Sequence, residues 1–199
     1  MNDGVFVEKF KIRLANELSE RRFIHSEKVM EVAVHLAKIY GADTQKAALA
    51  GLLHDYMREK SGKELLEYCK HYRISPSGME KRMPLLLHGP VAAKALKDNF
   101  GIVDTEIENA IYWHTTGCRK MALLSKIVFV ADTIEPSRNF PEVHQMRQLA
   151  ETDLDMAVLF ILEHQIDFVL SKKRLLHMET IFARDSLKVE IQNKKNKNC

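Results

Sequence analysis

Six residues that can bind a metal ion or move a proton fall where the hydrophobic pattern predicts buried helix faces. They are His25, His54, Asp55, His88, His114 and Asp132. His25, for example, lies four residues before Val29, which leads an apolar stripe. Burying a carboxylate or an imidazole without a partner costs free energy, so each side chain needs one. A shared metal ion would satisfy them together, because carboxylates and neutral imidazoles are metal ligands.

The simpler interpretation of any single buried histidine is a hydrogen bond to a backbone carbonyl or a pair with an aspartate. The number of such residues in one small helical chain favours the shared ion instead. The adjacent residues His54 and Asp55 matter most, since neighbours lie only about 100° apart around a helix and both can reach one ion near its end.

The elements that must position these residues are predicted to be helices. Pro and Gly are sparse, helical periodicity dominates, and no segment shows sustained two-residue alternation. We expect a loop at 75–78, a helix that opens at 89–90, helical spacing again in the C-terminal region, and helices over about 5–18, 20–40, 44–58, 61–72, 105–117, 121–134 and 152–170. Thr105 and Glu108 have the spacing of a capping box.

The expected fold class is therefore all-α, with one domain over 1–199. Its core is expected over about 20–172, followed by a C-terminal helical extension over 173–192 and a disordered Lys/Asn tail. The 199-residue length and the 46% hydrophobic content suit one globular domain with a real core.

Charge and cysteine usage exclude several classes of protein. Lys and Arg number 30 against 27 for Asp and Glu, a balance that argues against a nucleic-acid-coating surface. Cys69, Cys118 and Cys199 form no CxxC pair, as expected of reduced thiols. No signal peptide is visible, and the longest apolar run, 127–131, is too short to cross a bilayer. We expect a cytoplasmic protein with no membrane or nucleic-acid partner.

The order of His25, His54-Asp55 and Asp132 resembles the H…HD…D pattern of the HD superfamily of metal-dependent phosphohydrolases. The dipeptide alone is a weak signal, but the flanking runs GLLHD and VADTIEP strengthen it. Five segments are similar to the motifs of the YqeK-type HD proteins, the bacterial symmetrical bis(5′-nucleosyl)-tetraphosphatases. They are Arg22–Ser26, Leu53–Tyr56, Leu87–Pro90, His114–Gly117 and Ala131–Pro141.

This resemblance implies an HD-domain helical bundle that cleaves diadenosine tetraphosphate, a dinucleoside polyphosphate, into two molecules of ADP. The implied metal ligands are His25, His54, Asp55 and Asp132, with Asp55 also acting in catalysis. Iron is the implied metal, with manganese, cobalt and zinc as alternatives, because His/Asp sets accept all four. One or two ions are left open.

The other residues that the resemblance implies surround the phosphates. His88 and His114 would either bind a second ion or contact phosphate, where they can protonate the leaving ADP. The implied polyphosphate contacts are Arg22, Arg58, His88, His114, Thr115, Thr116 and Arg138. The alternative for Arg22 and Arg58 is a solvated helix face, and for Thr115 and Thr116 a helix terminus. The chain from Leu175 onward matches the family poorly, so no nucleoside contact is carried over there.

Two other functions stay open at this point. An HD-type nucleotidase, or a phosphohydrolase of an alarmone such as guanosine tetraphosphate, would use the same residues on another substrate. A non-catalytic metal- or nucleotide-binding module would need a broken ligand set, whereas all four expected ligands are present. The apolar pattern over 154–170 suits a core or a homodimer seam.

Overall fold

The computed structural model describes residues 3–197, and in that part of the chain every regular element is a helix. The all-α prediction is confirmed. The first half holds α1 Asp3–Glu17, α2 Glu20–Tyr40, α3 Thr44–Leu53, α4 Gly62–His71, α5 Gly78–Arg82, the 3₁₀ helix η1 Pro84–Leu87 and α6 His88–Phe100. The second half holds α7 Thr105–Trp113, α8 Leu123–Ile134, α9 Val143–Thr152, α10 Leu154–Ser171 and α11 Met178–Lys197. Within residues 3–197, no helix combines the length and apolar character needed to cross a lipid bilayer.

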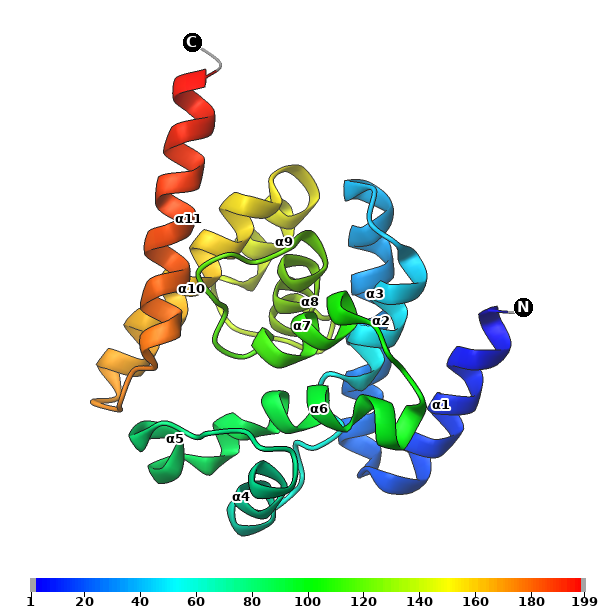
Figure 1. Cartoon of the computed structure of the whole chain (residues 1–199). Helices are drawn as coiled ribbons and strands as arrows, with labels where there is room; N and C mark the ends of the chain where they lie inside the picture. Colours follow the sequence, from blue (N-terminus) through cyan, green and yellow to red (C-terminus); the bar gives the residue numbers. More distant parts are fainter. Residues whose placement is uncertain (1–2, 198–199) are drawn as a thin grey trace.

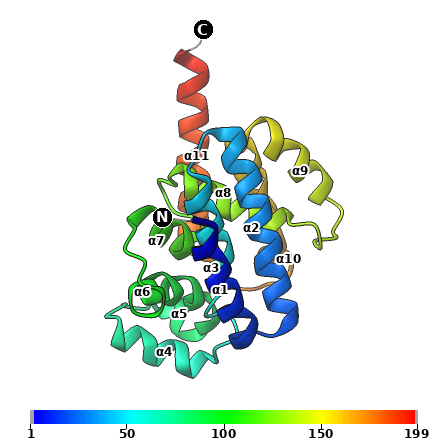
Figure 2. The same ribbon diagram turned by 90° about the vertical axis from the view of Figure 1, so that its right-hand side faces the viewer.

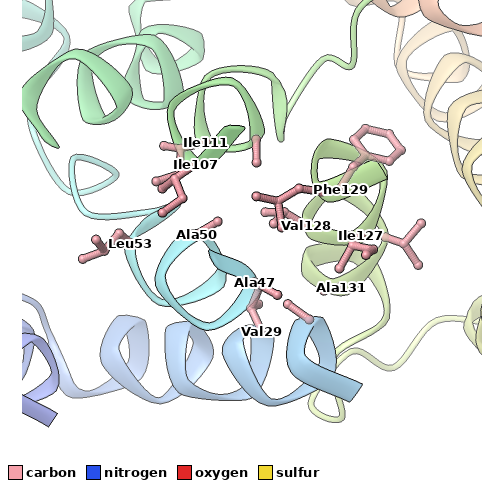
Figure 3. Close-up of a cluster of buried hydrophobic side chains, with 14 of the residues drawn as sticks. Val29, Ala47, Ala50, Leu53, Ile107, Ile111, Ile127, Val128, Phe129 and Ala131 are labelled. Carbon is pink, nitrogen blue, oxygen red and sulfur yellow. The ribbon is translucent and has the colours of Figure 1, made fainter. Parts of the chain in front are cut away.

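Helix α3 packs against α2, α7 and α8 around a cluster of buried hydrophobic side chains (Figure 3). Small residues on α3, such as Ala47 and Ala50, are fully buried and allow the neighbouring backbones to come close. At Gly51 the approach leaves no space for a side chain, because a Cβ there would lie 2.8 Å from Cα of Met30 on α2. The sequence therefore joins α2 and α3 through a contact that requires glycine.

Local signals fix the ends of α2 where the sequence predicts them. The Ser19 hydroxyl accepts a hydrogen bond from the backbone N–H of Arg22, which caps the N-terminus. Gly41 ends the helix in the left-handed region at φ +69°, and its N–H donates to the Ala37 carbonyl. Ser61 caps α4 through a capping box, with Glu64 as its second member.

Two predicted helix ends and one predicted cap are wrong, and one helix was not predicted. Helix α3 ends at Leu53 rather than near Arg58, because residues after it form turns with i→i+3 bonds, including Arg58 N–H to the Asp55 carbonyl at 2.9 Å. Helix α7 ends at Trp113, and its N-cap is Asp104, whose carboxylate accepts from the N–H groups of the two residues after Thr105. A separate helix, α9, occupies a segment where the sequence analysis predicts none.

Helices α10 and α11 pack side by side, and in both views α11 continues past the rest of the molecule (Figures 1 and 2). Ala183 and Leu187 bury the start of α11, and a Lys126–Asp155–Lys194 ion-pair chain ties its later part to α8 and α10. The helix runs to Lys197, so the prediction of a disordered tail is wrong for 193–197, and residues 198–199 lie outside the described part. The division into a core and an extension stays a prediction.

Candidate metal centre

The six candidate residues converge in one buried space, and most of them sit at helix ends. His25 is in the second turn of α2 and Asp132 in the last turn of α8. His54 and Asp55 directly follow α3, His88 begins α6 and His114 directly follows α7. Five are buried and the Asp132 side chain is 22% exposed. Five helices thus bring together residues more than 100 positions apart.

Asp55 joins the two halves of this cluster. Its Oδ2 lies 3.7 Å from Nε2 of His25 and 3.5 Å from Nε2 of His54. Its Oδ1 faces the other way, 3.1 Å from Nε2 of His88 and 3.6 Å from Nε2 of His114. Asp132 completes the first half, with Oδ1 3.1 Å from Nε2 of His25. One carboxylate therefore offers a separate oxygen to each pair of imidazoles.

In each histidine, the ring nitrogen that faces away from the shared space, Nδ1, makes a hydrogen bond. Nδ1 of His54 donates to the Gly51 carbonyl at 2.7 Å, and Nδ1 of His114 to the Ile111 carbonyl at 2.7 Å. His88 donates in the same way to the carbonyl of Leu85. A neutral imidazole that donates from Nδ1 carries a lone pair on Nε2. These histidines thus direct unprotonated nitrogens into the shared space.

In that arrangement, hydrogen-bond acceptors of the histidines and aspartates face one another in the shared space. The Nε2 atoms of His25 and His54 are buried without a hydrogen-bond partner, and those of His88 and His114 lie only 3.0 Å apart. Three groups have ligand atoms mutually within 4.8 Å: His25/His54/Asp55, His54/His114/Asp132 and Asp55/His88/His114. Imidazole nitrogens and carboxylates are the ligands of divalent metal ions, so the residues fit a metal centre.

Charge in the cluster follows from these contacts. Burial alone would raise the pKa of Asp55, but attraction to His54 and the close contacts with the imidazoles of His114 and His88 hold that pKa well below its usual range. Burial is likewise outweighed at Asp132, where the close contact with the His25 imidazole lowers the pKa. Burial lowers the pKa of His88, against the opposing contact with Asp55. The favoured state pairs ionised carboxylates with a neutral His88, which is the protonation state that metal binding requires.

Two of the predicted arginines contact the cluster. The Arg22 guanidinium donates from Nη1 to Asp55 Oδ2. Arg138 donates from Nη2 to Asp132 Oδ1 at 2.8 Å and from Nε to the carbonyl of the same residue at 3.0 Å. Each arginine thus lies against one of the two carboxylates, and the Arg138 side chain is 41% exposed.

Of the remaining residues predicted to contact phosphate, Thr115 and Thr116 lie at the cluster and Arg58 does not contact it. The Thr115 hydroxyl lies 3.0 Å from Nε2 of His114 and 3.4 Å from Nε2 of His88. Thr116 is buried next to it and donates its hydroxyl to the Gly117 carbonyl at 3.0 Å. Arg58 follows the turn after α3, and among the described residues its side chain makes no hydrogen bond or ion pair. The helix expected over 44–58 ends at Leu53, so Arg58 does not lie on it.

Two residues behind the cluster were missed by the sequence analysis. Glu135 is 1% exposed, and its Oε1 accepts from Nδ1 of His25 at 3.2 Å. Its carboxylate also accepts from the N–H and hydroxyl of Ser137. Arg147 of α9 donates to the carbonyls of Glu135 and Arg138, both at 3.0 Å. The only sequence signal was that Glu135 stands inside the run that follows Asp132.

Comparison with known proteins identifies the family of this chain. The family model described as HD domain matches residues 22–137, and the chain belongs to that family. A symmetrical bis(5′-nucleosyl)-tetraphosphatase from Halalkalibacterium halodurans is 39% identical over 87% of this chain and 92% of the relative. One from Bacillus subtilis is 37% identical over 84% and 89%. A crystal structure of a predicted HD superfamily hydrolase involved in NAD metabolism from Clostridium acetobutylicum superposes with a TM-score of 0.90, at 40% identity over 92% of this chain and 97% of that one.

Proposed function

We propose that this chain is a symmetrical bis(5′-nucleosyl)-tetraphosphatase, which adds water across the central anhydride of diadenosine tetraphosphate to give two molecules of ADP. The observation that carries the proposal is the buried cluster of four histidines and two aspartates. It occurs in a chain that is 37–39% identical, over most of its length, to proteins named for this activity.

We infer that the cluster would hold two metal ions, with Asp55 among the ligands of both. His25, His54, Asp55 and Asp132 would hold the first, and Asp55, His88 and His114 the second. The support is that each Asp55 oxygen faces a different pair of imidazoles. Iron is our expectation for the resident metal, with manganese, cobalt and zinc compatible with the same donors. When bound, such ions lower the pKa of water and offset charge on the attacked phosphate.

The Nδ1 hydrogen bonds of His88 and His114 favour metal binding by these residues over proton donation to the leaving ADP. Each donates from Nδ1 to a backbone carbonyl, so neither carries a proton on the Nε2 that faces the cluster. Arg22 and Arg138 lie beside the two carboxylates, where their planar guanidinium groups can bind phosphate oxygens. The Thr115 hydroxyl offers a further donor to phosphate. The geometry does not support a phosphate contact for Arg58.

Product analysis tests the proposal. The metal-loaded chain is incubated with diadenosine tetraphosphate, and the nucleotides are separated by chromatography. ADP as the sole nucleotide product is the expected result. Release of ATP and AMP would refute symmetrical cleavage, and much faster hydrolysis of nucleoside monophosphates or guanosine tetraphosphate would refute the substrate class.

A further inference from the structure

Two cavities adjoin the cluster, one at each half. The first, of about 590 Å³, is lined by Asp132, Arg138, Phe140 and His164 among others, and is called the Asp132 cavity. The second, of about 220 Å³, is lined by Met79, Met83, Leu86, Thr115 and Leu176 among others, and is called the Thr115 cavity. Gln165 and Phe168 of α10 line both. The cavities therefore share a wall.

Each cavity is lined by a residue that contacts a different half of the cluster. Asp132 belongs to the half with His25, whereas Thr115 contacts His88 and His114. These halves face the two separate oxygens of Asp55. A ligand whose ends entered both cavities would thus pass the cluster, and with it Asp55, between its ends.

The walls of both cavities suit a nucleoside. In the Asp132 cavity the rings of Phe140 and His164 stack at 5.3 Å between centroids and 23° between planes, beside the guanidinium of Arg138. Aromatic faces and cations are the groups on which bases stack. The Thr115 cavity is mainly apolar, with polar atoms at Gln165 and His177. Such a lining, apolar with a few placed polar groups, is typical of small-molecule sites.

The shared wall carries an exposed aromatic side chain. Phe168 is 51% exposed although it lies between two cavities, so the fold does not use its ring for packing. We propose that the two cavities are the two nucleoside subsites of a dinucleoside tetraphosphate, with Phe168 contacting both nucleosides. This rests on the proposed function. It explains symmetrical cleavage, because the two anchored ends place the central anhydride at Asp55.

Binding of ADP tests the subsites without turnover. Calorimetric titration of the metal-loaded chain should give two ADP molecules per chain, with unequal affinities because the cavities differ in size and lining. Phe140→Ala should weaken only one of them and Met83→Ala only the other, each by about tenfold, in line with the loss of one stacking or packing contact. Leu170→Ala is the matched control, since Leu170 is an exposed residue of α10 outside both linings.

Kinetics separates this proposal from the proposed function. For diadenosine tetraphosphate, Phe168→Ala should raise KM by about tenfold or more with kcat changed by less than about threefold, because it removes stacking and no catalytic group. A wild-type chain that releases ADP from this substrate but binds one ADP, or whose cavity variants behave like Leu170→Ala, overturns the subsites alone. A wild-type chain that releases no ADP overturns both proposals.

Discussion

At the scale of single residues, the centre depends on what lies behind each ligand. A histidine ligand is oriented by the group that accepts its other N–H, and such partners fix the tautomer. Three of the four histidines use backbone carbonyls, which no side-chain substitution can remove. His25 alone uses a side chain, that of Glu135. A conservative substitution of Glu135 can therefore test how the partner behind a histidine ligand affects metal binding.

Glu135→Gln should weaken metal binding by roughly 10–100-fold, the usual effect of altering a partner behind a ligand. The amide keeps the size of the side chain but loses the charge that strengthens His25 as a ligand. Metal affinity is measured by competition with a chelator. Glu151→Gln is the matched control, since Glu151 also pairs with a histidine, His35, but at the surface. Equal affinities for the two variants would contradict the assigned role.

The sequence was informative about residues whose polarity conflicts with their helix face. His25, His114 and Asp132 stand out for that reason, and the structure places them together. Glu135 follows an apolar helix at its exit, where an acidic residue is unremarkable, and its partner lies 110 residues away. Arg58 was placed by extending a helix that instead ends five residues earlier. Contacts made across the fold leave no local pattern.

At the scale of elements, the close packing of α2 and α3 holds His25 near His54. Their ring centroids are 5.2 Å apart, on helices that touch at Gly51 and Met30. The ends of α2 could be predicted because Ser19 and Gly41 carry local capping signals. The end of α3 could not, because the turn that follows contains neither glycine nor proline and holds its place through tertiary contacts.

Gly51→Ala should destabilise the fold by about 1–3 kcal/mol, because the added methyl group meets the α2 backbone and forces the helices apart. The free energy of unfolding is measured by urea denaturation. Gly78→Ala provides the control, since a Cβ at that position has no neighbouring atom within 4 Å. A Gly51 variant as stable as the control would show that the contact is not as tight as described.

At the scale of the whole molecule, the Thr115 cavity depends on segments far apart in the chain. Glu80 of α5 pairs with His177, just before α11, at 3.6 Å. The hydrogen bond with His177 lowers the pKa of Glu80 to about 2, from an ordinary value near 4.5. Such a carboxylate stabilises the fold fully above its unfolded pKa, and the stabilisation is lost as pH falls toward the folded pKa.

Glu80→Gln should therefore cost about 1 kcal/mol at neutral pH, a value reduced for solvent screening of a partly exposed pair. The difference between variant and wild type should stay constant from pH 7 to pH 5 and shrink below about 4.5, where the Glu80 carboxylate of the unfolded wild-type chain becomes protonated before that of the folded chain. Thermal unfolding at a series of pH values measures it. A difference independent of pH down to 3 would contradict the assignment.

The proposed hydrolysis requires that the cluster binds metal, and elemental analysis of protein purified without added metal or chelator shows whether it does. We predict at least one transition-metal ion per chain. The His54→Ala, Asp55→Ala double variant should lose the ion and fall below a hundredth of wild-type activity, because even partners behind the ligands are worth roughly 10–100-fold. A wild-type chain that contains no metal yet releases ADP at full rate, or a double variant that does, would contradict the central claim.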